Sequence, residues 1–216
     1  MRTLQYLKQH AYYYIYAIAF TVLLNFWISS RYTPVSGVEE VSKTPVFVID
    51  AGHGGIDGGT TSCTGVLEST LNLEIAIRLD RLLRLMGYQT VMTRTNQDSI
   101  ATEGETIRQQ KVSDLKKRVA IVEGTSNGVL ISIHQNFYPQ SQYFGPQVFY
   151  AAGNEELGEV VQKSLNRITQ AKGRASKKSS GVYLMEHITR PGILVECGFL
   201  SNPQEEVLLR QEGYQK

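Results

Sequence analysis

From residue 45 onward the sequence alternates short apolar runs with longer amphipathic stretches. This alternation is typical of α/β proteins, in which helices cover a central, largely parallel sheet. The clearest buried strand is the run VFVI at residues 46–49. We expect further strands at residues 88–93, 129–133, 147–150, 181–184 and 193–196. The sequence therefore predicts a single α/β domain with a mostly parallel sheet of about six strands flanked by helices.

Apolar residues recur every three or four positions between the first two runs, at Leu71, Ile75, Leu79, Leu82 and Met86. This spacing gives a helix one apolar face, and the glycine at position 87 is a typical residue to end it. Further helices are expected at residues 114–123, 155–169 and 203–210. The polar insertion at residues 96–112 indicates either a functional loop or local disorder.

The N-terminal part of the chain has a different character, because residues 11–29 contain no charged side chain. A helix of this length can cross the hydrocarbon layer of a membrane. Arg2 and Lys8 precede it, which places residues 1–10 in the cytoplasm and the rest of the chain outside. A cleaved signal peptide is the alternative, but the segment ends in ISSRYTP without an Ala-x-Ala-like site. Residues 30–44 are predicted to be a polar linker to the domain at residues 45–216.

Charge and cysteine content exclude several classes of protein. The chain has 22 basic and 20 acidic residues, a net charge of +2, so we expect no nucleic-acid partner. Its two cysteines, Cys63 and Cys197, exclude a disulfide-dense secreted scaffold and any multi-cysteine zinc or iron–sulfur site. We expect both to be free thiols, so the fold must depend on its hydrophobic core.

Metal-ligand residue types stand at the ends of the predicted strands. His53 follows the first strand in the run AGHGGIDGG, which fits neither common phosphate-binding glycine motif. His134 ends a strand and points to the crevice where open α/β sheets bind ligands. Two histidines and a carboxylate form a common zinc set in hydrolases. Glu68 would complete such a set, although the helix dipole alone also favours a glutamate at the start of a helix.

Other polar residues lie near the same edge of the predicted sheet. Glu196 closes the run ILV, where an unpaired carboxylate would be costly, so it is either functional or a salt-bridged strand end. Arg94 can hold a substrate carboxylate or form a structural ion pair. Asn136 and His187 are further candidates for substrate contact, whereas Arg118 is expected to be a packing or solvated helix residue.

Five motifs in fixed order resemble those of the zinc-dependent N-acetylmuramoyl-L-alanine amidases: IDAGHGGIDGG, TRT at residues 93–95, DLKKRVAI at 114–121, SIHQN at 132–136 and RPGILVECGFLSNP at 190–203. The Glu68 that opens a helix, between the first two motifs, adds to the resemblance. The resemblance covers most of residues 46–215. It implies that His53, Glu68 and His134 bind one zinc ion per chain and that Glu196 is catalytic. The details most resemble the germination-specific type of endospore formers, which acts on peptidoglycan before muramic-δ-lactam forms in the spore cortex.

Two features depart from the family pattern. Relatives usually continue beyond residues 212–216 into a terminal helix, so we expect this domain to lack that packing element. Gln135 stands where many relatives have a small residue, and we expect it to alter the wall of the pocket.

The resemblance and the apolar segment together predict a membrane-anchored, extracytoplasmic peptidoglycan hydrolase, in the cell wall or the forespore intermembrane space. It would need no organic cofactor, and the sequence leaves open an accessory activator protein. Two alternatives remain. One is a catalytically silent, membrane-tethered wall-binding module, and the other is a different zinc peptidoglycan hydrolase, a carboxypeptidase or a deacetylase.

Overall fold

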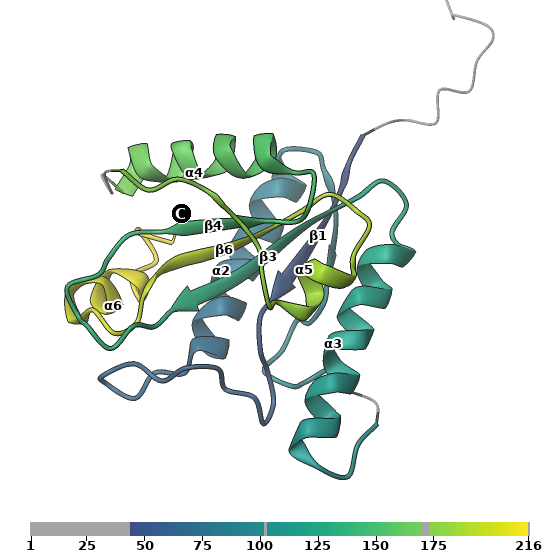
Figure 1. The fold of residues 1–216 in the computed structure, drawn as a ribbon, viewed down its shortest axis with the longest axis horizontal. Helices are drawn as coiled ribbons and strands as arrows, with labels where there is room; N and C mark the ends of the chain where they lie inside the picture. The colour runs from purple at the N-terminus through teal and green to yellow at the C-terminus, as the bar shows by residue number, and fades with distance from the viewer. Residues whose placement is uncertain (1–43, 102, 170–172, 216) are drawn as a thin grey trace, which may run out of the picture. The chain divides into compact units, whose positions relative to one another are not determined.

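A six-stranded sheet organises the part of the chain that the computed structural model describes, residues 44–101, 103–169 and 173–215 (Figure 1). Its strands are β1 (Val46–Ala51), β2 (Gln89–Met92), β3 (Gly128–Asn136), β4 (Gln147–Tyr150), β5 (Lys177–Lys178) and β6 (Gly192–Phe199). They lie in the order β2-β1-β3-β6-β4-β5, and every neighbouring pair is parallel except β4 with β6. The predicted α/β domain with a mostly parallel sheet is confirmed.

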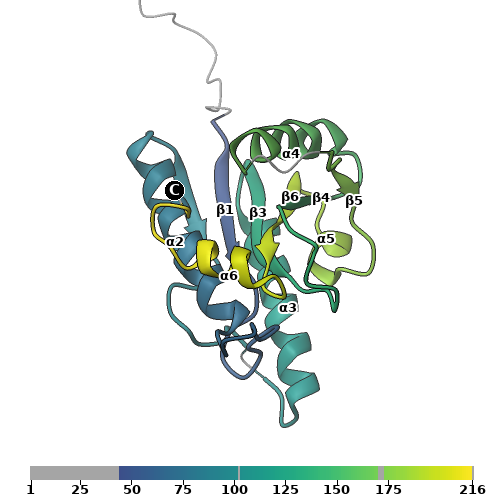
Figure 2. The same cartoon turned by 90° about the vertical axis from the view of Figure 1, so that its left-hand side faces the viewer.

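Helices cover both faces of this sheet (Figures 1 and 2). They are α2 (Glu68–Leu85), α3 (Ile107–Gly124), α4 (Glu155–Thr169), α5 (Tyr183–His187) and α6 (Pro203–Leu209). Helices α2 and α4 pack on one face around Ile133 and Val195, and α3 and α5 pack on the other around Leu130 and Leu194. Leu209 of α6 joins a smaller apolar cluster with Leu71 and Leu200. Alternate residues of β3 and β6 therefore enter two different cores.

Two expectations about secondary structure were wrong. Residues 181–184 were expected to form a strand, but α5 begins at Tyr183 and the edge strand is β5, a few residues earlier. Leu184 and Met185 are both buried, and consecutive buried residues fit a helical turn better than an exposed edge strand. The insertion at residues 96–112 is also shorter than expected, because α3 begins at Ile107. Thr106 and Gln109 form a capping box there, which the sequence could have revealed.

The predicted cytoplasmic residues 1–10, the anchor at 11–29 and nearly all of the linker at 30–44 lie outside the described residues. Within the ranges that are described, no helix is long and apolar enough to cross a membrane.

Candidate metal centre

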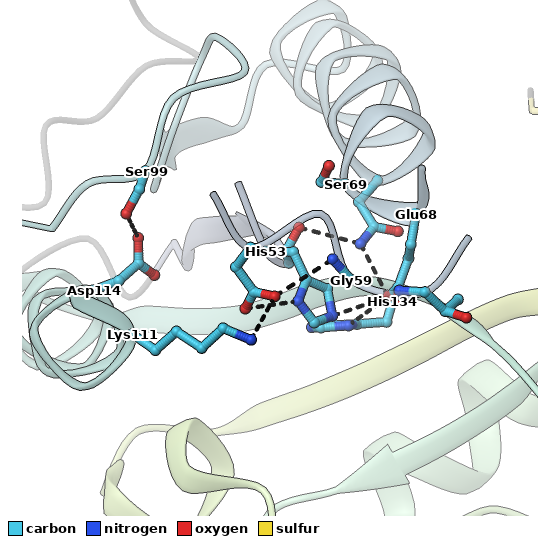
Figure 3. A network of polar contacts seen from close by, with 12 residues as sticks. His53, Gly59, Glu68, Ser69, Ser99, Lys111, Asp114 and His134 are labelled. Carbon is cyan, nitrogen blue, oxygen red and sulfur yellow. Dashed lines mark hydrogen bonds and ion pairs between the residues drawn. The ribbon is translucent and has the colours of Figure 1, made fainter. Parts of the chain in front are cut away.

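The carboxyl ends of β1 and β3 meet the first turn of α2 (Figure 3). His53 follows β1, His134 lies in β3, and Glu68 is the first residue of α2. Because β1 and β3 are parallel, with Ala51 paired to Ile133, both histidines come out at the same edge of the sheet. The structure thus brings together the three side chains that the sequence named as metal ligands.

The three side chains present their donor atoms to one small space. His134 Nδ1 lies 3.0 Å and His53 Nε2 lies 3.3 Å from the same oxygen, Glu68 Oε1. One donor atom from each residue lies within 4.8 Å of the other two. Two imidazole nitrogens and one carboxylate oxygen are a donor set typical of catalytic zinc, with a fourth position left for water or substrate. The residues present therefore fit a zinc ion.

The charges at this site favour a cation. Burial opposes the charged form of His53, but hydrogen bonds to Asp57 and Glu68 raise the pKa of its imidazole to about 9. Burial alone would also raise the pKa of Glu68, yet His134 and His53 hold it well below its usual range. A histidine ligand must be neutral at the coordinating nitrogen, so a metal bound at His53 Nε2 would compete with a proton there.

Glu196 lies beside His134 in the register of β3 and β6. Its Oε2 is buried and has no hydrogen-bond partner among the described residues. Burial raises the pKa of the Glu196 carboxyl to about 7, with the Glu68 charge adding to this effect and the two histidines opposing it. A carboxyl group with a free oxygen and a pKa near neutrality is suited to accepting and donating protons.

A sequence profile described as N-acetylmuramoyl-L-alanine amidase matches residues 47–216. The chain belongs to this family. It is 37% identical over 174 residues to the germination-specific N-acetylmuramoyl-L-alanine amidase of Bacillus subtilis strain 168, covering 79% of this chain and 73% of that protein. It is 28% identical to the amidase LytC of the same organism, of which it spans only 37%.

A solved structure agrees with the sequence comparisons. The CwlD amidase from Clostridioides difficile, in complex with the GerS lipoprotein, is 35% identical and superposes with a TM-score of 0.76 over 79% of this chain and 90% of that one. The family expected from the five motifs is therefore confirmed, and so is the resemblance to the germination-specific type.

Glycine is required at two positions of this amidase because the side chains of His134 and Glu68 lie against its backbone. A Cβ atom at Gly52 would lie 2.2 Å from His134 Nε2. One at Gly59, where φ is +70°, would lie 2.6 Å from Glu68 Oε2. His53 itself has a positive φ of 61°. The glycine-rich run therefore lets the backbone bend tightly around the donor atoms.

A buried ion-pair network supports the loop that carries His53. Arg118 of α3 contacts the carboxylates of Asp50 and Asp114, and its Nη2 donates to the His53 carbonyl oxygen at 2.7 Å. Asp50 also accepts hydrogen bonds from Ser132 and Thr93. Arg118 was expected to be a packing or solvated residue; it is buried and ties α3 to the ends of β1 and β3.

The proposed substrate contacts are not brought to one surface. Arg94 is buried and donates to four backbone carbonyls, those of Ala51, Gly52, Ser69 and Asn96, so its guanidinium supports the loops and does not face an open cleft. The imidazole of His187 is exposed and stacks on the ring of Tyr183, with 3.8 Å between the ring centroids. Asn136, at the end of β3, is partly buried, and its carbonyl accepts a hydrogen bond from Leu200.

The sequence analysis missed Asp57 and Lys111. His53 Nδ1 lies 3.0 Å from Asp57 Oδ2, and Lys111 Nζ of α3 lies 2.9 Å from Asp57 Oδ1 (Figure 3). A hydrogen bond from Nδ1–H to a carboxylate leaves Nε2 free to bind a metal. The available signal was an acidic residue four positions after His53, within the motif HGGID.

A cavity of about 190 Å³ adjoins His53 and His134. Its walls are mainly apolar and include Leu115, Val182 and Leu184, with Lys111 also contributing. Gln135 was expected to alter the pocket wall, but it is buried and donates to Asn72 of α2. Cys63 and Cys197 are both free thiols, as expected.

The Asp50–Arg118 pair predicts an acid-dependent loss of stability. Burial would raise the pKa of Asp50, but the Arg118 charge and its hydrogen bonds lower it from 3.8 to about 2. The folded state therefore holds this proton less readily than the unfolded state, and the resulting stability, about 2 kcal/mol, is present above pH ~4 and lost as the pH falls through ~2. The free energy of unfolding, measured with urea between pH 2 and 6, should fall more steeply with decreasing pH for the native sequence than for Asp50→Asn.

The exposed Asp98 provides the matched control. Asp98→Asn should leave the pH dependence of the free energy of unfolding as it is in the native sequence. Equal slopes for the native sequence and Asp50→Asn would contradict this account of the buried pair.

Proposed function

We propose that this amidase hydrolyses the bond between the lactyl group of N-acetylmuramic acid and the L-alanine of the stem peptide with one zinc ion, held by His53, Glu68 and His134. The supporting observation is the convergence of three donor atoms within 4.8 Å beside a buried oxygen of Glu196 that has no hydrogen-bond partner in the described part of the chain. Zinc, when bound, supplies Lewis acidity that polarises a carbonyl and lowers the pKa of water to roughly 7.

Glu196 carries the proton transfers in this proposal. Its free carboxylate oxygen accepts a proton from the attacking water, and the same oxygen returns a proton to the departing L-alanine nitrogen. Without that second transfer the amine is a poor leaving group. The position of Glu196 opposite His134 holds the carboxylate next to the ligand set without making it one of the converging donors.

Asp57 and Lys111 position His53. The Asp57 carboxylate holds the proton on Nδ1 of His53, and Lys111 compensates the charge of that carboxylate. Such partners orient a ligand and raise its basicity, and their loss typically weakens metal binding about 10–100-fold.

We further propose that the enzyme acts in spore cortex maturation, before muramic-δ-lactam formation, and in germination. The germination-specific amidase of Bacillus subtilis and the CwlD amidase of Clostridioides difficile support this assignment. The latter was solved with the GerS lipoprotein. We therefore propose that an accessory protein also binds this chain.

Residues 11–29 are proposed to anchor the enzyme in the membrane with the catalytic domain, residues 45–216, outside the cytoplasm. The uncharged run and the basic residues before it support this orientation. A reporter that functions only outside the cytoplasm should be active when fused after Lys216. A reporter that functions only in the cytoplasm should be inactive at the same position. The opposite pattern would refute the orientation.

The products identify the reaction. Purified protein with zinc, acting on spore-type peptidoglycan, should release peptides that begin with L-alanine and leave muramic acid with a free lactyl carboxylate. A chelator should abolish this release, and added zinc should restore it. Released D-alanine would instead mean a carboxypeptidase, released acetate a deacetylase, and no product a silent wall-binding module.

Two glutamine variants separate proton transfer from metal binding. Glu196→Gln should keep its zinc and lose about 10²–10⁴-fold in turnover, because it retains the shape of the side chain but cannot accept a proton. Glu68→Gln should lose zinc together with activity, because an amide oxygen is a weaker ligand. Zinc content by elemental analysis and kcat on muramoyl-peptide measure the two effects.

Glu159→Gln, on the exposed surface of α4, is the control and should change neither quantity. Loss of zinc from Glu196→Gln but not from Glu68→Gln would reverse the two roles. Full activity of Glu196→Gln would rule out the mechanism.

A further inference from the structure

The segment between β3 and β4 exposes an unusual number of aromatic side chains. Phe137, Tyr138, Tyr143 and Phe144 are 48%, 47%, 42% and 57% exposed. We call residues 137–146 the aromatic loop. Exposed apolar residues that stand singly are normal, but several gathered in one loop indicate a surface that binds something.

The aromatic loop is held in place by polar contacts from the segment that follows β6. The buried Glu205 accepts the backbone N–H of Gly145, and Asn202 Nδ2 donates to the carbonyls of Ser141 and Tyr143. The backbone N–H of Tyr138 donates to Ser201 Oγ. Figures 1 and 2 show the loop running beside α6. The exposure of the rings therefore belongs to a loop with a defined conformation.

The aromatic loop begins close to the metal ligands. Phe137 directly follows the end of β3, with two residues between it and His134, so about 10 Å of extended chain separates them. In the proposed substrate, a single lactyl ether joins the sugar ring to the scissile amide. Any productive complex must therefore hold part of the glycan strand within a short distance of the ligand set.

Charge distinguishes the two parts of such a substrate. Residues 135–154, which include the whole aromatic loop, contain no Asp, Glu, Lys or Arg. The glycan strand is neutral where its lactyl carboxyl is in amide linkage, whereas stem peptides carry free carboxylates. A sugar ring also has an apolar C–H face that packs against an aromatic ring. Arg174 lies against the loop, but its guanidinium is engaged by the Phe144 carbonyl and the ring of Phe199. The side chains of the loop itself are uncharged and rich in rings, and they fit the glycan better than the peptide.

We propose that the aromatic loop binds the glycan strand of peptidoglycan next to the scissile amide. This assignment rests on the proposed amidase function, and it extends that function to longer substrates. The loop gives the enzyme a contact with sugars on the strand that the reacting muramoyl unit alone does not use. A polymeric strand should therefore be bound and cleaved better than an isolated muramoyl-peptide.

The test uses the full chain with zinc and the double variant Phe137→Ala, Phe144→Ala. Binding to glycan strands stripped of stem peptide, with the lactyl carboxyls converted to primary amides so that the strand stays neutral, should weaken about tenfold, as expected for the loss of two ring contacts. The ratio of kcat/KM on polymeric peptidoglycan to that on a single muramoyl-peptide should fall by a similar factor. Zinc content and kcat on the single muramoyl-peptide should stay unchanged.

Two controls test whether binding depends on the aromatic rings or on any exposed apolar side chain. Phe137→Tyr with Phe144→Tyr keeps both rings and should retain binding to the stripped glycan. Leu85→Ala removes a side chain that is 85% exposed at the end of α2 and should have no effect.

Unchanged glycan binding by the alanine variant would overturn the proposal, and would leave the amidase function intact if the enzyme still cleaves muramoyl-peptide. Equal losses on the single unit and on the polymer would overturn it as well. If the native chain binds stripped glycan through the two rings but cleaves no amide, the glycan surface stands and the proposed function fails.

Discussion

The buried contact between Arg118 and Asp50 connects the fold to the site. It joins α3 to β1, and through Ser132 it reaches β3, so that the two strands bearing the histidines end at a common point. The same guanidinium holds the carbonyl of His53. Buried ion pairs contribute little net stability against apolar substitutes, but breaking one is costly. Here the pair also sets the position of a backbone turn, and a purely apolar contact could not do that.

The buried carboxylate between the two imidazoles needs hydrogen-bond donors from the surrounding residues. Glu68 accepts hydrogen bonds from the backbone N–H groups of Thr60 and Gln135 and from Asn72 Nδ2, in addition to its contacts with the two rings. Oε2 of Glu196, by contrast, has no hydrogen-bond partner within residues 44–101, 103–169 and 173–215. This contrast supports the different tasks that we propose for the two glutamates.

The sequence predicted the features that depend on periodicity and on motifs. The strands around Val48, Leu130 and Ile193, the start of α2 at Glu68 and the convergence of His53 with His134 all followed from local patterns. Features that depend on long-range contacts could not be read in this way. The hydrogen bonds from Arg94 to the carbonyls of Ala51, Gly52 and Ser69 and the pairing of Lys111 with Asp57 join residues that are distant in the sequence.

The strand order has a consequence for how this hydrolase is made. Strand β6, which carries Glu196, is nearly the last element of the chain, yet it lies inside the sheet between β3 and β4. A growing chain cannot complete this sheet, because the gap beside β3 stays open until residue 199 has emerged. Pairing strands so far apart in the sequence also slows folding. A nascent chain therefore lacks the strand that carries Glu196, and amidase activity can arise only with the finished domain.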